Sequence, residues 1–143
     1  MESAHPLIVH FPIALLLTSV LIGLSAVIAR RPSWHRMALW NLTLGVVGAA
    51  AAVLTGLQAE VVGRHTFEIW QVMERHKRLG FCTLILGAML AGWRLSKRDQ
   101  LTPGARLVTI LMELGLVGTL SWGAHLGGRL VYEFGVGGTF GVR

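Results

Sequence analysis

Residues 7–29 read LIVHFPIALLLTSVLIGLSAVIA, and this stretch decides the fold class. The run holds no Asp, Glu, Lys or Arg, and it has the length that an α-helix needs to cross a hydrocarbon core of about 30 Å. Three further runs, at 37–59, 79–95 and 105–126, are also long and mostly apolar. The sequence therefore predicts an all-α, membrane-spanning, up-and-down four-helix bundle that forms one transmembrane domain over residues 1–143.

The composition agrees with a lipid environment. Hydrophobic residues make up 53% of the chain and charged residues 14%, whereas soluble domains carry about 25% charged residues. We expect that the first span is not a cleaved signal peptide, because no Lys or Arg precedes it. The single cysteine, Cys82, allows no disulfide framework and no covalent c-type haem attachment, and we interpret it as a packing residue.

The net charge of +6 is assigned to the flanks of the spans rather than to nucleic-acid binding. Orientation in a membrane follows the excess of Lys and Arg in short loops. The first and third turns hold Arg30, Arg31, Arg36, Arg94, Lys97, Arg98 and Arg106, against Arg64, Arg75, Lys77, Arg78, Arg129 and Arg143 on the opposite face. This excess favours cytoplasmic first and third turns in a bacterial inner membrane. We therefore expect both termini, with a tail at 128–143, on the extracytoplasmic (periplasmic) face.

The connections and small residues add detail to the bundle. Thr102 and Pro103 are typical of an N-cap followed by the first helical residue. The amphipathic segment 66–73 predicts a short helix lying at the membrane interface. After His125 the chain becomes glycine-rich, which predicts an extended tail. Small residues within the second and fourth spans predict close helix packing: Gly45, Gly48, Ala52, Gly56, Gly115 and Gly118.

Four of the six histidines fall at the same end of the predicted spans. His5 and His10 open the first span, His76 precedes the third, and His125 closes the fourth. An up-and-down bundle places these four at one membrane face, where clustered imidazoles favour binding of a metal or of haem iron. The other two, His35 and His65, lie in turns among arginines, and we interpret them as hydrogen-bonding surface residues.

Small residues lie one helical turn deeper than three of these histidines. Ala14 follows His10, Gly80 follows His76, and Ser121 precedes His125. A flat macrocycle held edge-on between helices needs such clearance, whereas a compact metal ion does not. Three cations stand beside the histidines where haem propionates would need them: Lys77, Arg78 and Arg129. Haem b is therefore favoured over zinc or copper, which prefer thiols or tighter ligand spacing.

The spacing of the first two histidines bears on the number of haems. His5 and His10 are five residues apart, so on a helix they point about 140° from each other. They would not readily bind one iron from opposite sides. The predicted iron ligands are therefore His5, His10, His76 and His125, either in two bis-histidine centres or in one centre with a spare ligand. No catalytic residue is expected.

Glu113 lies near the middle of the fourth span. An ionisable group at this depth is costly in lipid and is a functional candidate by default. It could relay a proton or contact a quinone head group. It could equally be a hydrogen-bonded carboxyl that faces Thr and Ser side chains inside the bundle, and the sequence leaves these interpretations open.

Three segments carry a family resemblance. HPLIVHFPIALL (5–16), HKRLG (76–80) and GAHLGGRLVYEFGVG (123–137) resemble the DUF2231 family of small bacterial membrane proteins. The resemblance covers essentially the whole chain and implies a four-helix membrane protein whose hallmark histidines are His5, His10, His76 and His125 here. Some related sequences look fused to Rieske iron–sulfur domains, or lie beside cytochromes. The resemblance therefore implies a role in electron transfer.

The sequence thus predicts a b-type membrane cytochrome with one or two non-covalent haems, two being favoured, near the extracytoplasmic face. Bis-histidine ligation suits electron transfer, so we expect an electron-transfer subunit without its own catalytic site. The expected partners are the lipid bilayer, a c-type cytochrome or Rieske protein, and other membrane subunits. The alternatives are a structural or pigment-binding subunit and a copper- or zinc-binding membrane protein.

Overall fold

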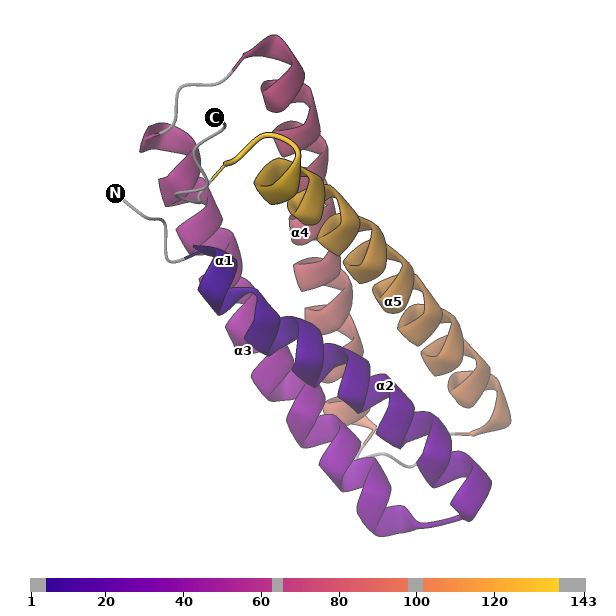
Figure 1. Ribbon diagram of the computed structural model, residues 1–143. Coiled ribbons are helices and arrows are strands. Elements are labelled where there is room, and N and C mark those ends of the chain that lie inside the picture. Colours follow the sequence, from indigo (N-terminus) through magenta and orange to yellow (C-terminus); the bar gives the residue numbers. More distant parts are fainter. Residues whose placement is uncertain (1–4, 63–65, 98–101, 137–143) are drawn as a thin grey trace.

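The computed structural model describes residues 5–62, 66–97 and 102–136. Within them the regular elements are helices: α1 (His5–Ile8), α2 (His10–Ala29), α3 (Pro32–Val62), α4 (Phe67–Ser96) and α5 (Pro103–Tyr132). The four long helices lie side by side and run alternately in opposite directions (Figure 1). Four segments are long and apolar enough to cross a membrane: His5–Ala29, Ser33–Glu60, Phe67–Ser96 and Pro103–Tyr132. The predicted all-α membrane bundle is confirmed.

Local sequence explains where the helices begin and break. The hydroxyl of Thr102 accepts a hydrogen bond from the Ala105 amide at 3.3 Å, which confirms the predicted N-cap before Pro103. A break at Val9 separates α1 from α2. Pro12 explains it, because a proline ring crowds the carbonyl four residues earlier, which here belongs to Ile8. The first span therefore consists of one helical turn, α1, followed after Val9 by the long helix α2.

Two predictions about the ends of the spans are wrong. The segment 66–73 is not a separate interfacial helix, because α4 runs without interruption from Phe67 to Ser96. No Gly or Pro stands between residues 67 and 79, so the charged residues there end the apolar run without ending the helix. The tail predicted at 128–143 also begins too early, because α5 continues to Tyr132. Residues 137–143 lie outside the described residues.

Packing against α4 explains why α5 continues through its glycines. Leu126 and Leu130 are buried against Val72 and Met73 of α4, and this contact outweighs the weak helix propensity of the intervening Gly127 and Gly128. Beyond Tyr132 the chain turns at Gly135, which has a φ of 65°. The Val136 amide then donates to the Leu130 carbonyl at 2.8 Å, which closes the helix end.

The helices form two hairpins, α2 with α3 and α4 with α5, that meet mainly through α3 and α4. One hydrophobic core joins all four in the middle of the bundle: Leu16, Leu42, Ala49, Leu90, Ala91, Leu116 and Leu120. Gly45 gives α2 its close approach to α3, since a Cβ there would lie 2.8 Å from a methyl carbon of Leu16. Cys82 is exposed, so its predicted packing role is wrong.

Candidate functional site

We call the two ends of the bundle the histidine end and the basic end. The histidine end is formed by α1, the start of α2, the end of α3, the first half of α4 and the end of α5. The basic end carries the connections from α2 to α3 and from α4 to α5 (Figure 1). His5, His10, His76 and His125 all belong to the elements of the histidine end, as the alternating helix directions require.

His5 on α1 and His76 on α4 are the only two described histidines whose rings lie next to each other. Their ring centroids lie 6.1 Å apart, with the ring planes at 80°. Both side chains are partly buried. Residues 71 positions apart in sequence, from the first and fourth helices, are thereby brought into contact by the fold.

Each of these imidazoles is oriented through its Nδ1 atom. The Thr55 hydroxyl donates to the carbonyls of Ala51 and Ala52, both at 3.0 Å, so its oxygen is left to accept from His5 Nδ1 at 3.2 Å. His76 Nδ1 lies 2.9 Å from the Gly123 carbonyl oxygen, which can only accept. The Gly123 carbonyl requires the proton of His76 on Nδ1, and the same tautomer of His5 suits the Thr55 oxygen. In this tautomer the lone pair on Nε2 is the one left for a metal.

Two glycines make room for the paired rings. A Cβ placed on Gly56 of α3 would lie 3.0 Å from Cε1 of His5. A Cβ on Gly127 of α5 would lie at the same distance, 3.0 Å, from Cε1 of His76. Each imidazole thus lies directly on the backbone of a neighbouring helix, and a larger residue at either position would displace it.

His10 and His125 are not brought to this pair. Both side chains are exposed on the surface of the bundle. His10 Nδ1 donates to the Pro6 carbonyl at 2.7 Å, and the His125 ring lies 5.7 Å from that of Trp122. Ala14 and Ser121, the small residues one turn from His10 and His125, are exposed as well. The clearance that they give therefore faces outward, not into the bundle. Gly80, beside His76, is half-buried near Val53.

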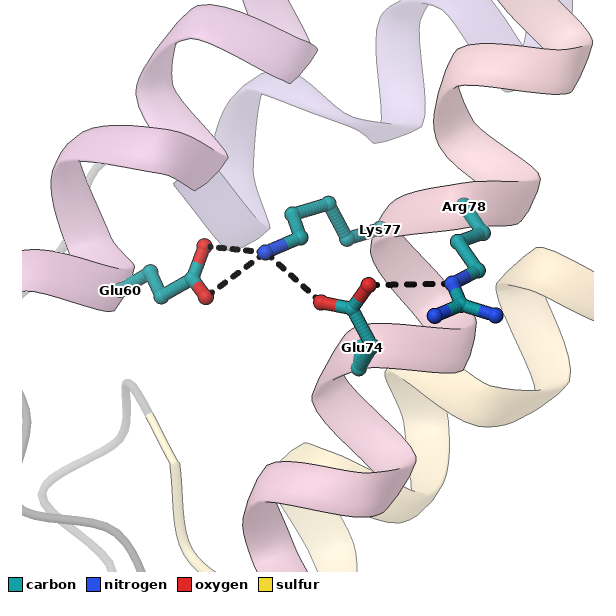
Figure 2. A network of polar contacts seen from close by, with 4 residues as sticks. All are labelled: Glu60, Glu74, Lys77 and Arg78. Atoms are coloured by element: carbon teal, nitrogen blue, oxygen red, sulfur yellow. Dashed lines mark hydrogen bonds and ion pairs between the residues drawn. The ribbon is translucent and has the colours of Figure 1, made fainter.

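The cations expected to bind propionates have carboxylate partners. Figure 2 shows the Lys77 ammonium between Glu60 of α3 and Glu74 of α4, at 2.9 and 2.8 Å. The other oxygen of Glu74 accepts from Arg78 Nε at 3.0 Å. The network is accessible to solvent, since the Lys77 side chain is 29% exposed and that of Arg78 is 75% exposed. It ties α3 to α4 beside His76.

The third of these cations, Arg129, forms an ion pair with Glu133 at the end of α5, with Nη2 and Oε2 2.8 Å apart. The hydrogen bond from Arg129 holds the pKa of the Glu133 carboxyl below its ordinary value, and the nearby His125 acts in the same direction. All three cations therefore stand at the histidine end as predicted, although each is already neutralised by a carboxylate.

A second group of ionisable residues lies at the basic end, and its key contact escaped the sequence analysis. Arg94 of α4 and Glu113 of α5 are both buried, with side chains 3% and 7% exposed, and Nη1 lies 3.7 Å from Oε1. Arg94 also donates from Nη2 to the His35 carbonyl at 3.1 Å. Glu113 does face the inside of the bundle, as one interpretation of the sequence held. Arg94 was interpreted only as a residue flanking a turn.

No group of three or more His, Cys, Asp or Glu side chains among the described residues is arranged to hold a metal ion. The donor set at the histidine end is therefore two imidazoles, His5 and His76. His65 lies outside the described residues. Two donors with free Nε2 atoms can bind a group that needs only axial protein ligands.

Four helices that are long and apolar enough to cross a membrane define a membrane protein of the helical-bundle class. The sequence profile of the family described as "Predicted membrane protein (DUF2231)" matches residues 2–139, and the chain belongs to that family. No curated protein and no solved structure matched the chain.

Proposed function

We propose that this protein is a b-type membrane cytochrome in which His5 and His76 are the axial ligands of a non-covalent haem. The observation that carries the proposal is the pairing of two imidazoles from different helices, both with Nδ1 engaged and Nε2 left to bind iron. Hydrogen bonds of this kind fix the tautomer and the ring orientation of a metal-ligating histidine. The Thr55 oxygen and the Gly123 carbonyl supply them here.

The distance between the ring centres is compatible with ligation of one metal by both imidazoles. Metal–nitrogen bonds of about 2.0–2.1 Å would place the two ring centres about 6 Å apart. The centroids of His5 and His76 are separated by 6.1 Å. Gly56 and Gly127 let the rings lie directly against the backbones of α3 and α5.

The size of the donor set favours haem over a bare metal ion. A structural zinc site uses four protein ligands and a catalytic one uses three. The described residues contain no such group of three His, Cys, Asp or Glu side chains. A haem already supplies four nitrogens and needs only two axial ligands from the protein, which is the number that His5 and His76 provide.

The geometry supports one haem within the chain more strongly than two. His10 and His125 are exposed, and each lies apart from the His5–His76 pair. Together with Ala14 and Ser121 they lie on outward-facing surfaces that a neighbouring subunit could cover. We therefore assign any second haem to the boundary with another membrane subunit.

A bis-histidine haem supplies one-electron transfer and has no open position for oxygen or substrate. The chain's own residues hold it and orient its ligands. The cations Lys77, Arg78 and Arg129 stand where propionates would emerge, although the carboxylates of Glu60, Glu74 and Glu133 would compete for them. Consistent with electron transfer, we assign the chain no catalytic site of its own.

The proposal extends to location and partners. We place the histidine end on the extracytoplasmic face of a bacterial inner membrane, because the turns of the basic end carry seven of the 13 Lys and Arg residues. A haem at that face would exchange electrons with an external c-type cytochrome or Rieske protein. The small mass outside the spans supports a role as one subunit of a larger redox complex.

Substitution of single histidines tests the ligand assignment. His5→Ala and His76→Ala should each abolish haem binding in the purified protein, measured by the reduced-minus-oxidised absorption spectrum and by haem extracted per chain. His35→Ala, at the basic end, is the matched control and should retain full haem. Full haem content in both His5→Ala and His76→Ala would refute the assignment.

The same spectra separate the two rival functions. An outward imidazole such as His125 is suited to hold a chlorophyll-type pigment by one axial bond, and pigment bands that disappear in His125→Ala would favour a pigment-binding subunit. A featureless spectrum with stoichiometric copper or zinc by elemental analysis would favour a metal-binding protein. A featureless spectrum without metal would favour a purely structural subunit.

A further inference from the structure

A cavity of about 50 Å³ lies at the basic end, on the other side of the hydrophobic core from the histidine pair. All four long helices line it: Gly23, Leu24, Val27, His35, Arg94, Arg106, Thr109, Ile110 and Glu113. A cavity needs about 10–15 Å³ of this measure for each water molecule, so it has room for about four. It is too small for a ring-shaped ligand such as a quinone head, for which sites of about 300 Å³ and more are usual.

The carboxyl of Glu113 forms one wall of the cavity. Its side chain is 7% exposed, and that of its partner Arg94 is 3% exposed. Nη1 of Arg94 lies 3.7 Å from Oε1 of Glu113, so the two groups form an ion pair beside the cavity. A buried ion pair is weak evidence for stability, because an apolar pair of similar volume is often as stable or more so. The presence of a buried ion pair here is therefore better explained by a function that involves the adjoining cavity than by stability.

Gly23 keeps the approach to Glu113 open from α2. A Cβ at this position would lie 3.4 Å from Oε1 of Glu113 and 3.9 Å from Nη1 of Arg94. A methyl group can therefore be added there without a clash, and it would occupy part of the space beside both charged groups. Gly23 is thus a position from which the cavity can be narrowed without breaking the bundle.

The remaining polar groups of the wall lead towards the surface. His35 of α3 lines the cavity, and its backbone carbonyl accepts the hydrogen bond from Arg94 Nη2. Arg106, on the first turns of α5, is exposed. Arg94 of α4 also lines the cavity. The lining residues of α2 are Gly23, Leu24 and Val27, and these three have no ionisable side chain. Among the described residues that line the cavity, Glu113 is the only one with a carboxyl group.

We propose that this cavity is a proton-exchange site, in which Glu113 takes up and releases protons through water that enters from the basic end. In uptake, an O–H bond of a hydronium ion breaks, an O–H bond forms on the Glu113 carboxylate, and a neutral water molecule is left. No electrons are exchanged, and the charge of the carboxylate is neutralised. Arg94 stabilises the ionised state between uptake events, since an opposite charge nearby favours it.

Infrared spectroscopy of the protein in liposomes tests this proposal. On acidification the C=O stretch of a protonated carboxyl should appear and should shift when H2O is replaced by D2O. The band should be lost in Glu113→Gln and displaced in frequency in Glu113→Asp, which retains a carboxyl if the glutamine variant fails to fold. The measurement needs no haem, so its outcome is independent of the cytochrome proposal.

The rate of the deuterium shift then tests the route. Gly23→Ala narrows the cavity and should slow the exchange at Glu113 by about tenfold or more. The matched control is Gly92→Ala on α4, where an added Cβ meets nothing within 4 Å, and it should exchange at the wild-type rate. Equal rates in all variants, or the absence of any Glu113-dependent band across the pH range, would overturn the proposal.

Discussion

The two ends of the bundle hold their charges in opposite ways. At the histidine end, Lys77 and its carboxylate partners are between a fifth and a third exposed and share a network that reaches water. At the basic end, Arg94 and Glu113 are almost completely buried. Water can freely hydrate the first set if a partner is removed. In the second set the remaining charge would be largely shielded from bulk water by the four helices. Equivalent substitutions at the two ends should therefore have very different effects.

The largest effect is expected from breaking the buried pair on one side. Arg94→Met leaves the Glu113 carboxylate without its cation and should lower the free energy of unfolding by about 3–5 kcal/mol. The double variant Arg94→Met/Glu113→Leu should recover most of this loss, because both charges are gone. The measurement is reversible unfolding in detergent micelles. A double variant as unstable as the single one would contradict the view that the unpaired charge is responsible.

The same change of a glycine to alanine gives a second contrast between the ends. Gly56→Ala should push the His5 ring from Thr55 and lower the free energy of unfolding by about 1 kcal/mol, the value of one hydrogen bond. Gly23→Ala, where the nearest atom lies 3.4 Å from the added carbon, should leave the stability close to that of the wild type. Equal stabilities of the two variants would show that the His5 ring is not held as described.

A smaller effect is expected at the exposed network. Lys77→Met removes the cation shared by Glu60 and Glu74, yet both carboxylates remain accessible to water. The free energy of unfolding should fall by about 0–1 kcal/mol, well below the effect of Arg94→Met in the same assay. A loss as large as that of Arg94→Met would remove the distinction between the two ends.

The smallest effect concerns pH at the end of α5. Because Arg129 lowers the pKa of Glu133 in the folded state, this pair stabilises the helix end at neutral pH. The contribution is lost as the pH falls below 4.5, the ordinary pKa of a glutamate, and through the lower folded-state value. Amide hydrogen exchange at residues 133–136, corrected for intrinsic rates, should show local opening increase over this range. Glu133→Gln should not show the change.

The sequence predicts the number of spans, their direction and the Thr102 cap well, because span length and capping chemistry are local properties. It fails where apolar runs and helices have different ends. The charged residues between positions 74 and 78 lie outside the apolar run but suit an α-helix, so α4 begins about three turns before the predicted span. In α5, Leu130 packs on α4 and carries the helix past two glycines.

The candidate site is predicted only in part, for a different physical reason. Helices that are apolar on every side carry little information about which face turns inward. The shared end of the four histidines follows from topology alone, but the inward position of His5 and the outward position of His125 depend on packing. The Arg94–Glu113 contact is hidden for the same reason, since its members stand in different spans and face each other only once α4 and α5 are packed.

The connection between α2 and α3 consists of Arg30 and Arg31 alone, with Arg30 in a left-handed conformation whose amide bonds to the Ala26 carbonyl. Two helices joined so tightly cannot enter a bilayer far apart and search for each other. The short connection favours insertion of α2 and α3 as a hairpin, in which Gly45 lies against Leu16. The contact between His5 and His76 joins that hairpin to the second one, so it can form only after α4 is in place.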